Sequence, residues 1–153
     1  ITNMKKGGQK EEIKYKNEIK LKYLTEKEGN ERIFRSEFVE NNINNISLII
    51  NGKKYTAKIE KNKTAQSFVN MLPVEYNMSE LNGNEKYIYL NNTLPINSYN
   101  PKHIEAGDIM LYGNNCLVVF YKSFDTSYSY TKIGHINDLS DLGNRDIIIK
   151  FEY

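Results

Sequence analysis

Apolar and polar residues alternate along most of the chain after residue 45. The stretch "ISLIINGKKYTAKIE" (46–60) holds two alternating runs joined by Asn51-Gly52, a dipeptide that accepts the positive φ of a tight hairpin turn. Period two is typical of strands with one buried face. Further short apolar or alternating runs predict strands at "VEYNM" (74–78), "KYIYL" (86–90), "DIMLY" (108–112), "CLVVFY" (116–121), "YTKIGHI" (130–136) and "DIIIKFEY" (146–153).

One segment has helical spacing instead. Within "NKTAQSFVNMLP" (62–73), Asn62 or Thr64 can cap a helix and Pro73 cannot continue one. The spacing predicts a helix from Thr64 to Leu72, because its apolar positions lie three and four residues apart, at Ala65, Phe68, Val69 and Leu72.

The remaining connections complete a mainly β pattern. "NDLSDLG" (137–143) predicts one short helical turn, "SELNGNE" (79–85) a loop, and residues 91–107 a long irregular connection. Seven or more short strands with a single clear helix predict a closed antiparallel β-barrel.

The first 45 residues have a different character. "EIKYKNEIKLKYL" (12–24) alternates with period two and predicts an extended segment, and "RIFRSEFVE" (32–40) predicts a second one. The polar run "NNINN" (41–45) marks the expected boundary between an N-terminal extension, residues 1–45, and a barrel domain, residues 46–153. Extended N-terminal segments also leave open an interaction domain that pairs with the sheet edge of a partner.

Composition narrows the function classes. The 153 residues are 39% hydrophobic and 26% charged, with 12 Tyr, 6 Phe and no Trp, which fits a globular domain. Residues 1–30 carry eight Lys and five Glu, whereas residues 31–153 carry 13 basic and 14 acidic side chains. The barrel domain therefore lacks the excess basic charge that a nucleic-acid interface requires. The Lys-rich start is interleaved with Glu and indicates a solvated tail, with contact to an anionic membrane as the alternative.

Few residues suggest covalent or metal chemistry. Cys116 is the only cysteine, begins an apolar run, and is expected to be a buried, inert thiol. His103 and His135 lack a second ligand at metal spacing, so no metal and no cofactor is predicted. No transmembrane run or signal peptide is visible. A chain that starts at Ile1 leaves two compartments open: the cytoplasm, or export if a signal or lipid anchor precedes it.

The order of these pieces resembles the cyclophilin fold. "NKTAQSFVNML" is similar to the first cyclophilin helix, with its K-T-A-x-x-F pattern, and "AGDIMLYGNNCLVVFY" to the hairpin that begins P-G-D-L-S-M-A. "YTKIGHINDL" resembles the element H-V-V-F-G-K-V. Together with "LNGNEKYIYL", these motifs resemble small bacterial cyclophilin-like proteins of unassigned function, over about residues 46 to 153.

The resemblance implies a groove, but two polar groups of the isomerase are changed. Prolyl isomerases of this family use an Arg in a segment of the type F-H-R-I-I, and the matching stretch here, residues 74–90, has no Arg. The pocket His of the family corresponds to Tyr130. The resemblance therefore implies a binding module for a small molecule or an extended peptide; the alternative is a weak prolyl isomerase that relies on an apolar pocket. The expected groove residues are Met78, Glu85, Tyr87, Tyr89, Tyr112, Phe120, Tyr128 and Tyr130.

The Tyr-rich stretch "KSFDTSYSY" (122–130) allows two interpretations. Phe124, Thr126, Tyr128 and Tyr130 share one parity, as in a half-buried strand. The functional alternative is a binding wall, because Tyr combines apolar area with a hydroxyl group. Asp125 lies near two serines, but the sequence places no His beside them, so a catalytic triad is not predicted. The carboxylates of Glu80 and Glu85 are expected to be solvated, with Glu85 kept as a groove candidate.

Overall fold

A computed structural model describes residues 27–28, 31–32 and 41–153, and the chain divides into two compact units, Ile1–Ile43 and Asn44–Tyr153. Within the first unit, β1 (Lys27–Glu28) pairs with β2 (Glu31–Arg32) in antiparallel orientation. The extended segment predicted over residues 12–24 lies outside the described residues, as does most of the one predicted over residues 32–40.

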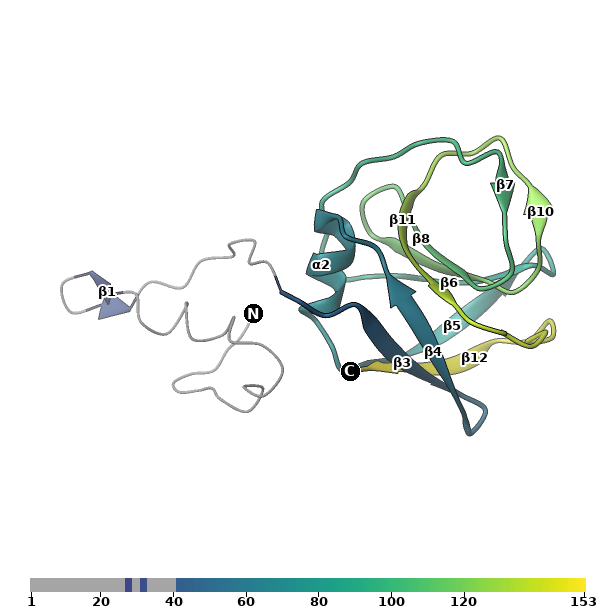
Figure 1. The fold of residues 1–153 in the computed structure, drawn as a ribbon, viewed down its shortest axis with the longest axis horizontal. Coiled ribbons are helices and arrows are strands. Elements are labelled where there is room, and N and C mark those ends of the chain that lie inside the picture. The colour runs from purple at the N-terminus through teal and green to yellow at the C-terminus, as the bar shows by residue number, and fades with distance from the viewer. Residues whose placement is uncertain (1–26, 29–30, 33–40) are drawn as a thin grey trace. The chain divides into compact units, whose positions relative to one another are not determined.

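The second unit is a closed antiparallel barrel of eight strands (Figure 1). Each strand is hydrogen-bonded to its neighbours in the order β11-β4-β3-β12-β5-β6-β9-β8, and β8 closes the barrel onto β11. This confirms the predicted mainly β, closed barrel architecture. The strands are β3 (Asn45–Ile50), β4 (Lys53–Ile59), β5 (Val74–Leu81), β6 (Glu85–Tyr89), β8 (Asp108–Tyr112), β9 (Cys116–Phe120), β11 (Thr131–Ile136) and β12 (Ile147–Glu152).

The predicted helix is present as α2 (Lys63–Val69). Asn62 caps it, because its Oδ1 accepts a hydrogen bond from the Ala65 amide at 2.8 Å. The helix ends at Val69, earlier than the predicted Leu72. It contacts β11, and the buried Phe68 ring meets the Phe151 ring edge-on at 5.3 Å. Among the described residues, no helix has the length and apolarity needed to cross a membrane.

The strands β8 and β9 form a wall that is buried on both faces. Ile109 lies opposite Val119 on the face toward the barrel interior, and all of their side-chain surface is buried. On the other face, Tyr112 lies opposite Cys116 and is 45% exposed, so this face points outward. Burial on both faces explains why the sequences of these strands are continuous apolar runs.

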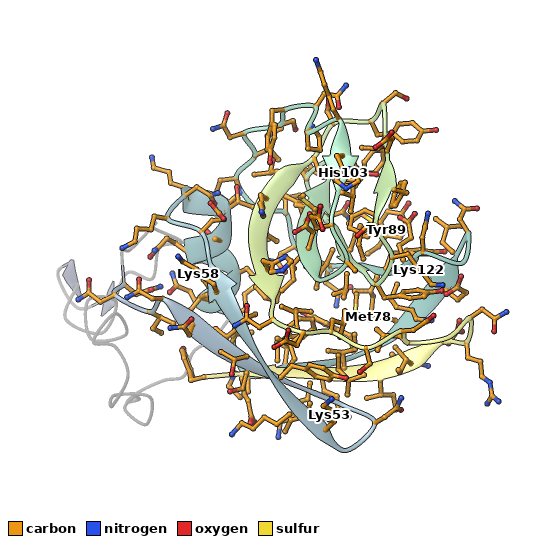
Figure 2. The ribbon with its side chains drawn as sticks, turned by 45° about the vertical axis from the view of Figure 1, so that its right-hand side comes forward. Lys53, Lys58, Met78, Tyr89, His103 and Lys122 are labelled. Carbon is orange, nitrogen blue, oxygen red and sulfur yellow. The ribbon has the colours of Figure 1, made fainter. Side chains whose placement is uncertain are left out.

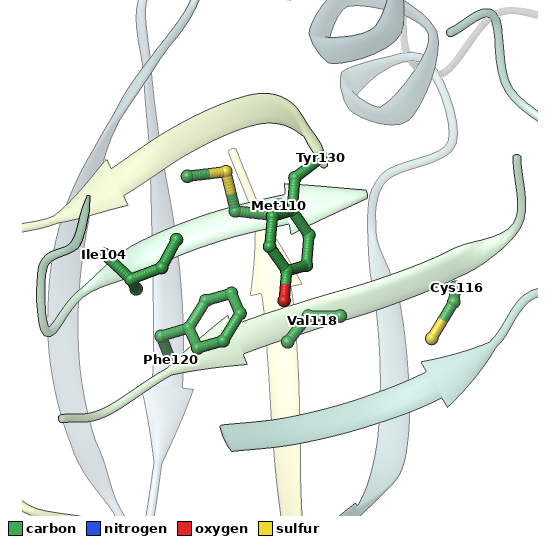
Figure 3. Close-up of a cluster of buried hydrophobic side chains, with 6 residues drawn as sticks. All are labelled: Ile104, Met110, Cys116, Val118, Phe120 and Tyr130. Atoms are coloured by element: carbon green, nitrogen blue, oxygen red, sulfur yellow. The ribbon is translucent and has the colours of Figure 1, made fainter. Parts of the chain in front are cut away.

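A second cluster of buried side chains covers the outer face of this wall (Figure 3). Met110, Val118 and Phe120 come from the wall, and Ile104 and Tyr130 come from the connections that fold over it. Cys116 lies at the opposite end of the cluster from Ile104 in the figure. The covering segments are held by a small two-stranded sheet of β7 (His103–Ile104) and β10 (Phe124–Asp125), which the sequence patterns did not predict.

Two local predictions are wrong. Residues 137–143 form no helical turn: Asp138 has a positive φ of 54°, and the Asp141 Oδ1 accepts a hydrogen bond from the Gly143 amide at 2.9 Å, which favours a turn instead. Strand β5 continues to Leu81 rather than ending at residue 78, so the loop before β6 shrinks to a tight turn. Asn82 and Gly83 both have positive φ there, as such a hairpin turn requires.

Candidate functional site

A cavity of about 480 Å³ opens on the outer face of the barrel wall, between β6 and the segment that follows β10. Strand register explains which side chains reach it. Glu85 lies opposite Phe120, Tyr87 opposite Val118, and Tyr89 opposite Cys116, so the odd-numbered residues of β6 share the outward face of β9. The lining residues are Leu81, Asn82, Asn84, Glu85, Tyr87, Tyr89, Tyr112, Cys116, Val118, Phe124, Asp125, Thr126, Ser127, Tyr128 and Tyr130.

Most of the residues expected in the groove lie together in this cavity. Six of them line it: Glu85, Tyr87, Tyr89, Tyr112, Tyr128 and Tyr130. The other two, Met78 and Phe120, do not. Met78 lies two residues before Glu80 in β5, so both side chains point to the inner face of the barrel, and Met78 is fully buried (Figure 2). Phe120 faces outward but lies beneath the lining, where the Tyr130 ring covers it edge-on at 5.5 Å.

The tyrosine rings form walls at steep angles to one another. Tyr87 and Tyr89 on β6 have ring centroids 5.9 Å apart and planes at 78°. Across the cavity, Tyr112 meets Tyr128 at 6.2 Å and 82° and meets Tyr130 at 5.7 Å and 55°. Edge-to-face contacts of this kind stabilise aromatic clusters. Tyr89 and Tyr128 are 64% and 62% exposed, so they form the rim of the cavity. Tyr130 is only 5% exposed and forms part of its floor.

The segment after Phe124 is an irregular stretch that lines the cavity, rather than the half-buried strand that its parity suggested. Only Phe124–Asp125 form a strand, and the next four residues are irregular. Residues of both parities line the cavity as a result, at Asp125, Thr126, Ser127 and Tyr128. The Thr126 Oγ1 accepts a hydrogen bond from the Tyr128 amide at 3.1 Å, and the Thr126 side chain also bonds the Tyr130 hydroxyl. Thr126 therefore links the rim to the floor.

Glu85 is a half-buried carboxylic acid among these rings, not the solvated residue that the sequence suggested. Burial, and then the charge of Glu80, raise the pKa of Glu85 to about 7. Within the described part of the chain, its side chain makes no hydrogen bond or ion pair. Its charge also reaches the Cys116 thiol, whose pKa burial and Glu85 together raise to about 11. Cys116 is thus buried, as predicted, and its raised pKa disfavours the reactive thiolate form.

A histidine lies beside Asp125, which sequence reasoning missed. The β7–β10 pairing places His103 directly opposite Asp125, and the His103 Nδ1 is 2.8 Å from the Asp125 Oδ1. The His103 Nε2 is 3.0 Å from a Glu105 carboxylate oxygen. The hydrogen bond with Asp125, followed by the charges of both acids, raises the pKa of His103. Both ring nitrogens of His103 are engaged by carboxylates. The histidine therefore connects β7 to β10 and is not a free base.

The opposite face of β6 carries a second group that the sequence did not reveal. Lys86 is fully buried and points into the barrel, where its Nζ donates to the Glu80 Oε1 at 2.8 Å and to the carbonyls of Gly143 and Arg145 at 2.6 Å each. The Tyr121 hydroxyl donates to the same Glu80 oxygen at 2.8 Å. Burial alone would raise the Glu80 pKa, but the hydrogen bonds from Lys86 and Tyr121 hold it below its ordinary value. Because Lys86 is fully occupied, it does not neutralise Glu85.

Other candidate chemistry does not converge on the cavity. His135 contacts Asp108 at 2.8 Å, away from the lining residues. No group of three side chains suited to holding a metal ion occurs within the described ranges. The Asn84 Oδ1 is buried and has no hydrogen-bond partner among the described residues.

The described lining of the cavity contains no guanidinium group. Strand β5 contributes Leu81 at the position opposite Glu85, and no arginine occurs among the lining residues that the structure describes. Arg145 lies in the connection before β12, and its carbonyl oxygen accepts a hydrogen bond from Lys86. Tyr130 occupies the floor with its hydroxyl engaged by Thr126.

Comparison with known proteins gives one match. A model described as "Cyclophilin-like family" matches residues 48–152, which spans all eight barrel strands except the first residues of β3. Searches of curated proteins and of solved structures found no match.

Proposed function

Because the chain belongs to the cyclophilin-like family, we propose that its barrel is a binding module, and that the tyrosine-lined cavity holds a small molecule or a short stretch of extended peptide without efficient prolyl isomerisation. The observation that carries this proposal is the cavity of about 480 Å³ with five tyrosines and one unpaired carboxylic acid on its walls. Its volume lies in the range of ligand sites in proteins.

The chemistry of the lining supports binding more than catalysis. Lowering the barrier of about 18–20 kcal/mol to rotation about a prolyl amide requires a donor to the proline nitrogen or stabilisation of the twisted amide. The described lining provides carboxylates, hydroxyls and ring surfaces but no arginine. The hydroxyl of Tyr130 is engaged by the Thr126 side chain. Ring surfaces and hydroxyls can position a ligand without either catalytic device.

The direct test is an amide-resolved NMR titration of the full chain. The probes are acetylated and amidated Ala-Pro-Ala, together with a panel of neutral, anionic and cationic fragments. We expect shifts concentrated at residues 85–89 and 124–130 for at least one probe, with no acceleration of prolyl exchange in the peptide. No shift at these residues with any probe would overturn the binding proposal. Fast prolyl exchange would overturn its non-catalytic part.

A further inference from the structure

The charges that line the cavity have one sign. Among the described lining residues, the charged side chains are Glu85 and Asp125, and both are acidic. Lys86, the nearest lysine in sequence, lies on the opposite face of β6 and is bound to Glu80 and two carbonyls. Asp125 is partly neutralised by His103, so Glu85 carries the uncompensated charge. A buried carboxylate without a partner is unfavourable unless a cation neutralises it.

The rings around Glu85 supply a second attraction for the same kind of ligand. The face of a tyrosine ring carries negative potential and attracts a cation within about 6 Å of its centre. The pairs Tyr87–Tyr89 and Tyr112–Tyr128 have planes at 78° and 82°, so the rings form walls in several directions rather than a flat stack. A cavity lined by perpendicular rings and a carboxylate matches the chemistry that recognises alkylammonium groups.

Resting on the proposed function, we propose that this cavity selects a ligand that carries an organic cation, a protonated amine or a quaternary ammonium group, held by the Glu85 carboxylate and the tyrosine rings. The cation has two sources, a free small molecule or a lysine side chain of an extended peptide, and its chemistry at the cavity is the same in both.

Proton and cation compete for Glu85. Its pKa of about 7 means that Glu85 is mostly charged at pH 8 and mostly neutral at pH 6. If the cation binds the charged form, its affinity falls about tenfold between pH 8 and pH 6. Other titratable or charged groups near Glu85 come from β5, β9, β10 and the adjoining segments: Glu80, Cys116, Tyr121, Asp125 with His103, and Tyr130. Protonation of His103 also lowers the negative charge of the cavity as pH falls, so a variant of Glu85 is needed to assign the effect.

The test measures binding to the full chain by calorimetry at low ionic strength, where exposed charges are least screened. Choline is compared with 3,3-dimethylbutan-1-ol, which has the same shape and no charge. n-Butylammonium is compared with n-butanol, and acetyl-Ala-Lys-Ala-amide with the same peptide containing norleucine. We expect each cation to bind at least about tenfold more tightly than its neutral partner. Tighter binding of the lysine peptide than of n-butylammonium identifies a peptide as the source.

Variants assign the attraction to the cavity. Glu85→Gln keeps the shape of the side chain and should weaken cation binding about tenfold and abolish most of its pH dependence, whereas Glu60→Gln, outside the cavity, should change neither. Tyr128→Leu removes an exposed ring and should weaken binding severalfold, and Tyr128→Phe, which keeps the ring, should weaken it less. Tyr99→Leu, at an exposed position outside the cavity, should bind like the parent protein.

The outcomes separate the two proposals. Neutral partners that bind the cavity as tightly as the cations, or cation binding that is indifferent to Glu85→Gln, would overturn the cation proposal and leave the binding module intact. If no cation and no fragment binds the cavity in either measurement, both proposals are overturned.

Discussion

Replacing Lys86 by methionine should sharply destabilise the barrel although the substitution keeps most of the side-chain volume. The Lys86 ammonium is fully buried and makes hydrogen bonds of 2.8, 2.6 and 2.6 Å to Glu80, Gly143 and Arg145. It also lies 4.6 Å from the centre of the Tyr121 ring. Lys86→Met leaves the Glu80 carboxylate and two carbonyl groups without this donor.

The size of the loss in unfolding free energy depends on which hydrogen-bond partners of Lys86 remain without a donor. Removing one member of a buried ion pair typically costs about 3–5 kcal/mol, because the remaining charge is left uncompensated. Glu80 keeps two donors, the Tyr121 hydroxyl and the Gly83 amide, so the lower end of this range applies. We expect the free energy of unfolding to fall by about 3 kcal/mol.

Urea unfolding followed by circular dichroism measures this change, with Lys122→Met as the matched control. Lys122 pairs with Asp141 at 3.0 Å, but both side chains are more than half exposed, so its loss should cost less than about 1 kcal/mol. If Lys86→Met unfolds at the same urea concentration as Lys122→Met, the buried ammonium does not stabilise the fold as described. The double variant Lys86→Met/Glu80→Gln should recover part of the loss, since it removes the stranded charge.

Three further outcomes are expected. Glu85 has a folded-state pKa of about 7 against an ordinary value of 4.5, so the native state holds the extra proton and stability falls as pH rises through this window. Glu85→Gln should therefore be more stable than the parent at pH 8, by about 1–2 kcal/mol once partial solvent contact is allowed for, and equal to it at pH 4 in urea titrations. A coupled assay with an Xaa-Pro peptide should show little isomerisation; turnover that collapses in Tyr130→Phe would make the cavity an active site. A fragment of residues 44–153 contains all eight barrel strands and should unfold cooperatively in calorimetry, whereas a broad transition would mean that the N-terminal residues belong to the barrel.

The parts of the fold that sequence patterns predicted are those with strong local signals. Asn51-Gly52 between two alternating runs predicted the first hairpin of the barrel, and apolar spacing with a capping Asn62 predicted α2. Local signals are weakest where the tertiary structure decides. The two-residue strands β7 and β10 pair across a separation of about twenty residues, and no periodicity exists over so short a run, so the contact of His103 with Asp125 could not be anticipated.

The same limit applied to the cavity. Tyrosines and Glu85 could be assigned to a groove through the family resemblance, and six of the eight residues line one cavity. The prediction that Met78 lines the groove is wrong because of its position in β5. The strand runs on to Leu81, which faces the cavity, and Met78, three residues earlier, therefore faces the barrel interior. A lysine in a strand is ordinarily taken as a surface residue, so the inward placement of Lys86 had no signal in the sequence; its partners come from β5 and from the connection before β12.

The wall formed by β8 and β9 separates side chains that pack the barrel from side chains that line the cavity. Side chains on its inner face, such as Ile109 and Leu117, pack the barrel, whereas Tyr112 on the outer face and Glu85 on the adjacent strand β6 reach the cavity. Substitutions at the exposed rim, at Tyr89 or Tyr128, alter the lining of the cavity while the packed interior is untouched. The rim positions of this chain can therefore be randomised as a library without first re-engineering the packed interior of the barrel.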